Sequence, residues 1–355
     1  MICLDANAFY WYFGRDKLPL PESIPKFDVD KVKTFLDARK DKSITASAYM
    51  EILVNFRDKP QTIRELTRFI EKKHIKIYNN LLNHVFKPRE LSLCSLMNDY
   101  QLMHYANKLL ETKIEIETEF SYVFMQVVGI LYANHCLKSN FNICDSVKDN
   151  ILNFLYRNME ETLKEKWYSE LKTSLIDGYN DNNKSQQYLK KKYIELLTQN
   201  CVIAHIIIET IQNIDNEDDL YSFMCNVATN VKNNGFNESD TMKTISRTLN
   251  NDSIFLQFAE KEIGDIFLRK GYTLHQSKYI VVMLKAWLER GRKFCKNDIF
   301  DMMCIAALDK TNTDPNWITP IDPTTYLITF DDVMVDFIKN TKYSNFKLID
   351  QFYFH

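Results

Sequence analysis

The sequence predicts an α/β protein in which a small parallel-sheet core, formed by both chain ends, is interrupted by a large all-α insertion, so that the chain is mostly helical overall. The chain has 355 residues but only seven glycines and eight prolines, roughly a third and under half of average usage. This scarcity excludes sandwiches, barrels and propellers, which need a turn about every ten residues. Strand-like runs occur near the two ends, whereas helical apolar spacing fills the middle.

The first part of the core is predicted to span residues 1–60. ICLD at 2–5 is a short apolar run that closes on an aspartate, and KSITAS at 42–47 is a β-branched run. Both patterns are typical of strands. A helix is expected to follow the second strand, with Ser47 as its N-cap.

The helical insertion is predicted to span residues 61–290. It holds long amphipathic runs at 63–82 and 99–132, and almost no strand signal. Its most apolar stretches begin at Phe120 and Cys201. Polar residues interrupt the first and the second is too short to span a bilayer, so we expect buried helices and no membrane segment.

The second part of the core is predicted to span residues 291–355. TTYLITFDD at 324–332 and FKLID at 346–350 have strand character, and VMVDFIKNTK between them has helical spacing. Strands that alternate with helices imply a parallel sheet with helices on its faces.

Composition excludes several classes of function. The net charge is -2, so no global basic field indicates nucleic-acid binding. The glycine-rich motifs GxGxxG and GxxxxGK[ST] do not occur. The eight cysteines form no CxxC pair, which predicts reduced thiols rather than disulfides or a zinc site. Met1 leads directly into ICLD without a signal peptide, and we expect a cytoplasmic protein.

Carboxylates occur at points that such a sheet would bring together. Asp5 and Asp331 each end a predicted strand, and ligands of open α/β sheets bind beyond the carboxyl ends of strands. Glu51 lies in the first turns of a helix at the same edge, and Asp298 and Asp301 share a face at a helix start. Clustered carboxylates need a compensating cation. Hard oxygen ligands suit Mg²⁺ or Mn²⁺, which can activate water for phosphodiester hydrolysis.

The beginning of the chain resembles that of the PIN-domain nucleases, which are metal-dependent ribonucleases. The opening strand of that family ends in Asp-x-Asn, as in LDAN with Asp5 and Asn7. Its second acid is a glutamate after a strand ending in Thr/Ser-Ala-Ser, which matches Glu51 in TASAYME.

The end of the chain continues the resemblance. The third acid of the family starts a helix rich in Ile and Ala, and in NDIFDMMCIAA Asp301 fits this position better than Asp298. The fourth acid corresponds to Asp331 in LITFD, with Asp332 as support and Thr329 in the same strand. The resemblance covers residues 1–58 and 292–355. The chain departs from the family in the long segment between the second and third acids.

The resemblance implies a metal-dependent endoribonuclease that cleaves RNA rather than DNA. Its catalytic residues would be Asp5, Glu51, Asp301 and Asp331, which with Asp298 would bind Mg²⁺ or Mn²⁺. By family analogy the protein would be a toxin or a phage-defence effector. Its insertion would select substrate, form a homodimer or bind an inhibitor or antitoxin protein.

Substrate phosphates could contact basic residues near the third acid. Phosphate binding needs only Lys or Arg along a groove. The candidate substrate-binding residues are Asn7, Arg290, Arg292, Lys293 and Lys296. A charge run of this kind is also typical of a solvated face.

Each candidate has a plainer interpretation. Asp5 could cap the next helix, and Glu51 could lie on a solvated helix face. Asp298 could cap its helix, Asp332 could complement a helix dipole, and Asn7 could make only a turn hydrogen bond.

Three other classes of protein share part of the pattern. The pairs Arg68–His74 and Arg269–His275 have the Arg-x5-His spacing of metal-independent HEPN ribonucleases, although the apolar Phe69 follows the first arginine. Haloacid-dehalogenase-type phosphatases also end a first strand in aspartate, but Asn7 stands where they need an acid/base aspartate. A non-catalytic scaffold for protein or RNA binding is the third alternative.

Overall fold

The computed structural model of the protein describes residues 2–14, 29–78, 94–138, 143–180, 199–211, 217–234, 267–268, 276–283, 296–305, 326–329, 334 and 337. The chain divides into two compact units. Unit 1 comprises Met1–Lys113, Lys270–Ile280 and Lys296–His355, and unit 2 comprises Ile114–Arg269 and Val281–Cys295. Unit 1 therefore includes all of the first predicted core segment and residues 296–355 of the second, together with residues 61–113 and 270–280. The predicted domain bounds at 60 and 290 stay a prediction.

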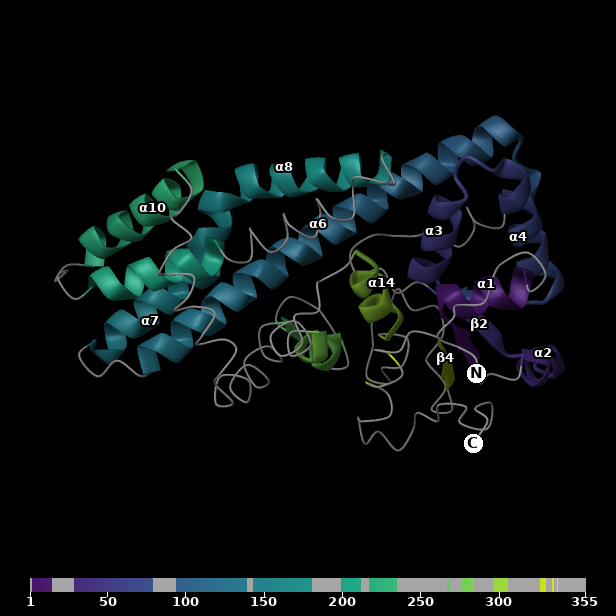
Figure 1. Ribbon diagram of the computed structural model, residues 1–355, viewed down its shortest axis with the longest axis horizontal. Coiled ribbons are helices and arrows are strands. Elements are labelled where there is room, and N and C mark those ends of the chain that lie inside the picture. The colour runs from purple at the N-terminus through teal and green to yellow at the C-terminus, as the bar shows by residue number, and fades with distance from the viewer. Residues whose placement is uncertain are drawn as a thin grey trace. The chain divides into compact units, whose positions relative to one another are not determined.

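Unit 1 contains a four-stranded parallel sheet with the order β3-β2-β1-β4 (Figure 1). Central strand β1 pairs with strands from both parts of the chain, since Cys3 lies opposite Ser43 on β2 and Leu327 on β4. The small parallel sheet within a mostly helical protein confirms the predicted fold class at this level. The strands are β1 (Ile2–Leu4), β2 (Lys42–Thr45), β3 (Lys76–Tyr78) and β4 (Tyr326–Ile328).

Strand β3 corrects the expectation of a helix through residues 63–82. Helix α4 (Pro60–Lys72) ends earlier, where the Ile75 N–H donates to the Ile70 carbonyl at 3.0 Å and His74 takes a left-handed φ of 52°. This closure is the Schellman type, in which glycine is usual at the left-handed position. Because histidine rather than glycine occupies this position, the sequence does not indicate where α4 ends. Strand β3 has only three residues, which is too short for a recognisable strand pattern. The predicted strand at 346–350 lies outside the described residues.

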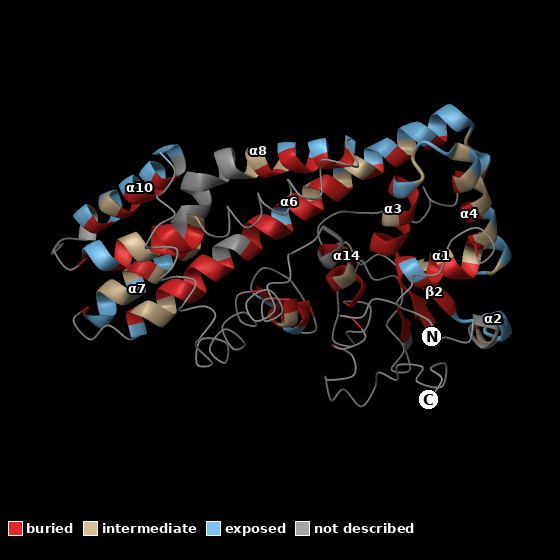
Figure 2. Ribbon diagram, viewed as in Figure 1, coloured by how far each residue is buried: buried red, intermediate tan, exposed pale blue. Residues whose placement is uncertain are grey.

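Helix α3 (Ala46–Asn55) is the central helix of unit 1. It contacts β2, β3, α1 (Ala6–Gly14) and α14 (Lys296–Ile305), and most of its residues are buried (Figure 2). The α3 N-cap is Thr45, whose hydroxyl accepts from the Ala48 N–H at 3.2 Å. The prediction that Ser47 caps this helix is therefore wrong, because the helix begins one residue after the strand ends.

Aromatic residues join α1 to α4. Phe69 of α4 contacts the rings of Phe9, Tyr12 and Phe13, with centroids 6.0, 5.1 and 5.4 Å away. This explains the apolar residue after Arg68, which is itself exposed, as is His74. The other described helical segments of unit 1 are α2 (Val29–Ala38), the 3₁₀ turn η1 (Cys94–Leu96), the first part of α6 (Asp99–Lys138) and residues 276–280.

Unit 2 is helical in its described residues. Helix α8 contacts both the π-helical turn η2 and α10, and aromatic rings join further elements, as where Phe120 of α6 lies 6.0 Å from Phe267. Its elements are the remainder of α6, α7 (Asp145–Asn153), η2 (Phe154–Asn158), α8 (Met159–Asn180), α10 (Glu217–Asn234) and helical residues 199–210.

Among the described helices, α6 alone is long and apolar enough to cross a membrane. Its apolar window is 81% buried within the protein, as in the core helix of a soluble protein. This is weak evidence for a membrane span.

Candidate functional site

Asp5 lies at the carboxyl end of β1 and is almost completely buried, with 2% exposure. Its Oδ1 accepts from the Ala8 N–H at 2.6 Å, which caps α1. Its Oδ2 accepts from the hydroxyl of Thr329, which follows β4, 324 residues along the chain. The alternative interpretation that Asp5 caps the next helix is confirmed. The same carboxylate joins the two ends of the chain at the carboxyl edge of the sheet.

Cys304 brings α14 to the same edge. Its thiol lies 3.4 Å from the Thr45 hydroxyl and 3.8 Å from the Ser47 hydroxyl, at the corner where β2 leads into α3. Burial raises the pKa of Cys304 well above its usual value, and the negative charges of Asp5 and Asp301 raise it further. Asp301 lies one turn earlier on α14 and is half-buried. The charges of both Asp5 and Asp301 therefore reach this buried thiol.

Glu51 lies on α3 beside a buried cation. Its Oε1 is 3.9 Å from the Nζ of Lys113 on α6, and the two side chains are 14% and 1% exposed. The same Nζ lies 4.2 Å from the ring centroid of Phe300, the residue before Asp301. Burial raises the pKa of Tyr10 on α1, and the charge of Glu51 raises it further. Glu51 thus lies among α1, α6 and α14 rather than on a solvated face.

The chemical types of the side-chain oxygens at this edge are suitable as ligands for a hard divalent cation. Carboxylate and hydroxyl oxygens are the ligands that Mg²⁺ and Mn²⁺ prefer. The neighbouring thiols are softer donors, which these hard cations favour less. Burial raises the pKa of Cys3 to about 12, and burial also raises the pKa of Cys304.

The predicted ligand set is only partly described. Within the described part of the chain, no three His, Cys, Asp or Glu side chains gather closely enough to hold a metal ion. Asp331 and its neighbour Asp332 lie outside the described residues. The backbone of Asp298 lies in α14, but its side chain is not described. Asp5, Glu51 and Asp301 are described and do not by themselves form such a group, so the site of four carboxylates stays a prediction.

The predicted substrate-binding residues are mostly outside the described part of the chain. This holds for Arg290, Arg292 and Lys293 and for the side chain of Lys296. Asn7 is exposed in the first turn of α1, two residues after Asp5. Of the two Arg–His pairs, Arg269–His275 also lies outside the described residues.

Lys113 is the neighbour of the predicted acids that our sequence interpretation missed. The α6 sequence does contain a signal that Lys113 is buried. Apolar residues that are buried in the structure recur along α6 at alternating intervals of four and three positions, and Lys113 occupies one of these positions. The stripe consists of Leu102, Ala106, Leu109, Lys113, Ile116 and Phe120. A lysine in an apolar stripe is a buried charge that needs a partner.

Comparisons of the chain with protein-family models, with curated proteins and with solved structures found no significant match. The likeness to PIN-domain nucleases therefore rests on the order and surroundings of the four acid motifs.

Proposed function

We propose that this protein is a metal-dependent endoribonuclease with a PIN-like core, which hydrolyses RNA phosphodiester bonds with Mg²⁺ or Mn²⁺. The observation that supports the proposal is that the chain ends carrying the acid motifs lie side by side at one sheet edge. Asp5 accepts from the Thr329 hydroxyl, and α14, which carries Asp301, packs against α3. Such an edge is where ligands of open α/β sheets bind.

The chain's own residues would hold and shape the site. Asp5, Glu51, Asp301 and Asp331 would supply the oxygen ligands, with Asp298 as a further carboxylate. A bound Mg²⁺ or Mn²⁺ would supply an activated water and stabilise the leaving oxygen. The Ala8 N–H and the Thr329 hydroxyl fix the orientation of the Asp5 carboxylate, so this ligand needs little reorganisation when a cation binds.

The biological setting is proposed by family analogy. We propose a cytoplasmic toxin or defence effector that acts on RNA in preference to DNA. The helical residues outside the core would bind an inhibitor or antitoxin protein, select substrate or form a homodimer.

The proposal is tested by cleavage of labelled single-stranded RNA, structured RNA and DNA in Mn²⁺, Mg²⁺ or EDTA. Wild type is compared with Asp5→Asn and with Asp58→Asn, a control in which the aspartate is 76% exposed. Asparagine is also a good N-cap, so Asp5→Asn should keep the fold while cleavage is lost. Asp58→Asn should cut at the wild-type rate.

The outcomes separate the candidate classes. Cleavage by Asp5→Asn at the wild-type rate would show that the metal-site assignment is wrong. Cleavage that survives EDTA would favour the metal-independent mechanism of the Arg–His pairs. Release of inorganic phosphate from phosphomonoesters without RNA cleavage would favour a phosphatase.

A non-catalytic scaffold is the second candidate, and one observation favours it. Both Asp5 oxygens already accept hydrogen bonds within the protein, and Glu51 already has a cationic neighbour. These contacts give the two acids structural roles of their own. Absence of both cleavage and Mn²⁺ binding would support the scaffold.

A further inference from the structure

Lys113 is a buried ammonium group at the candidate site. Its side chain is 1% exposed, which is rare for lysine, because removing an ammonium from water has a large free-energy cost. Such a charge persists in a fold only with compensating neighbours. The described neighbours of the Lys113 Nζ include the Glu51 carboxylate, 3.9 Å away, and the face of the Phe300 ring, whose centroid is 4.2 Å away.

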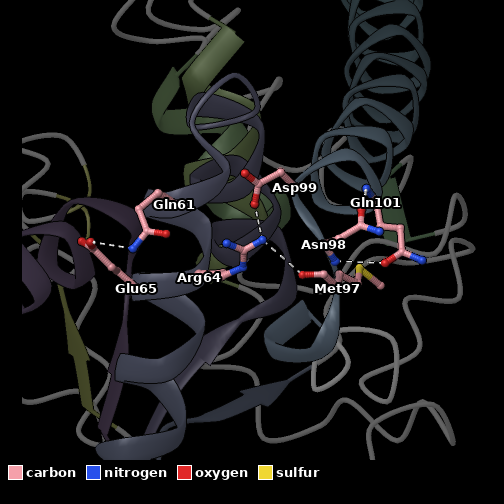
Figure 3. A network of polar contacts seen from close by, with 7 residues as sticks. All are labelled: Gln61, Arg64, Glu65, Met97, Asn98, Asp99 and Gln101. Atoms are coloured by element: carbon pink, nitrogen blue, oxygen red, sulfur yellow. Dashed lines mark hydrogen bonds and ion pairs between the residues drawn. The ribbon is translucent and has the colours of Figure 1, made fainter.

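The start of α6 is anchored so that Lys113 reaches this position. Asn98 and Gln101 form a capping box, in which each backbone N–H donates to the other side chain at 2.9 Å. Arg64 of α4 bonds the Met97 carbonyl and the Asp99 carboxylate (Figure 3). Lys113 follows about four turns further along α6. Its position relative to Glu51 is therefore set by contacts within unit 1.

Lys113 also contacts both helices that carry the second and third proposed acid ligands. Glu51 lies on α3, whereas Phe300 immediately precedes Asp301 on α14, and α3 contacts α14. One ammonium group thus lies between the helices that carry the second and third acids. A positive charge there lowers the mutual repulsion of the carboxylates, and it also repels an incoming cation.

We infer that Lys113 is a positioning residue of the proposed metal site, whose ammonium holds the Glu51 carboxylate in place and offsets part of the negative charge that attracts the metal. This inference rests on the proposed function. Its consequence is that Lys113 weakens metal binding while it supports turnover. A lysine that only stabilises the fold would do neither.

The test compares wild type with Lys113→Met, which removes the charge at similar length, and with Lys113→Arg, which keeps it. Lys172→Met is a matched control, because Lys172 pairs with Glu115 of α6 at 3.4 Å but is 39% exposed. Mn²⁺ binding is measured by calorimetry, RNA cleavage at saturating Mn²⁺, and thermal unfolding in EDTA.

We expect Lys113→Met to bind Mn²⁺ at least about tenfold more tightly than wild type. The substitution removes the ammonium charge, whose repulsion of a nearby divalent cation is large even at an effective dielectric of about 20. We also expect its cleavage rate at saturating Mn²⁺ to fall about tenfold or more as Glu51 loses its orientation. Lys113→Arg keeps the charge and should bind Mn²⁺ within about threefold of wild type, and Lys172→Met should stay within about threefold in both measurements.

Affinity for Mn²⁺ that is unchanged or weaker in Lys113→Met would overturn the inference while leaving the proposed function intact. Wild type that binds no Mn²⁺ and cuts no RNA would instead refute the proposed function, and the inference with it. If Lys113→Met does not fold, as judged by circular dichroism, Lys113→Gln takes its place. This variant also removes the charge but keeps a polar amide at the same depth.

Discussion

Replacing Glu51 by glutamine should destabilise the protein substantially in the absence of any metal. The substitution keeps the shape of the side chain but removes its charge. The Lys113 ammonium, 1% exposed and 3.9 Å from Glu51, then loses an anionic neighbour. Removing one partner of a buried ion pair leaves the other charge poorly compensated, which is far more costly than losing an exposed pair.

The magnitude follows from the geometry of the pair. Two unit charges at 3.9 Å attract by about 4 kcal/mol at an effective dielectric of about 20. Glu51 is 14% exposed, so water screens part of this attraction, and the glutamine carbonyl restores some of it. The Phe300 ring still faces the ammonium. We therefore expect Glu51→Gln to lower the free energy of unfolding by about 2–3 kcal/mol.

The assay is urea denaturation in EDTA, followed by circular dichroism and by hydrogen exchange of the α3 amides. Asp145→Asn is the control, because the Asp145–Lys148 pair is shorter, at 3.2 Å, but Asp145 is 95% exposed. We expect this control to cost less than about 0.5 kcal/mol. Equal costs for the two variants would refute the reasoning, since burial and not distance is what should separate them. The double variant Glu51→Gln/Lys113→Met should recover part of the loss.

The remaining predictions concern Asp5 and the cysteines. Thr329→Val removes the hydroxyl that donates to Asp5, and it should lower the free energy of unfolding by about 1–3 kcal/mol; an unchanged melting temperature would argue against this hydrogen bond. With iodoacetamide at pH 8, the exposed Cys144, whose pKa is lowered by the Ser146 hydroxyl, should react first among the described cysteines. Cys3, with a pKa raised by burial to about 12, should react only after unfolding; peptide mass spectrometry that finds early labelling of Cys3 would contradict this.

The strands that were predictable from the sequence are those with strong local patterns. ICLD and YLITF combine β-branched or apolar residues with an acid or a threonine at the end, and both form strands next to each other in the sheet. The position of Asp5 followed from these patterns, because the carboxyl ends of parallel strands share one edge. The register could not follow, since it depends on pairing between segments more than 300 residues apart.

Features that depend on contacts between distant helices were not predictable. The sequence around Glu51 is equally consistent with a solvated helix face and with a metal ligand. Sequence could not separate the two, because the surroundings of Glu51 come from helices that are distant along the chain: α1, α6 and α14. Lys113 lies in ETKIEIETEF among acidic residues, a pattern typical of a solvated helix. Only the apolar stripe on α6 that includes position 113 distinguishes Lys113 from a surface lysine. The stripe predicts burial, but it does not predict that Glu51 is the neighbour of the ammonium.

The two described acids on the N-terminal part of the core are held in different ways, and this bears on how a cation would enter. Asp5 accepts from a backbone N–H and a hydroxyl, and these dipoles orient its charge without cancelling it. The charge of Glu51 is offset by Lys113 at 3.9 Å. In the proposed function, attraction for a cation would therefore come mainly from Asp5 and Asp301, whereas Glu51 would contribute a ligand whose position is fixed in advance. A site of this kind binds its metal less tightly than four uncompensated carboxylates would, and it stays folded when the metal is absent.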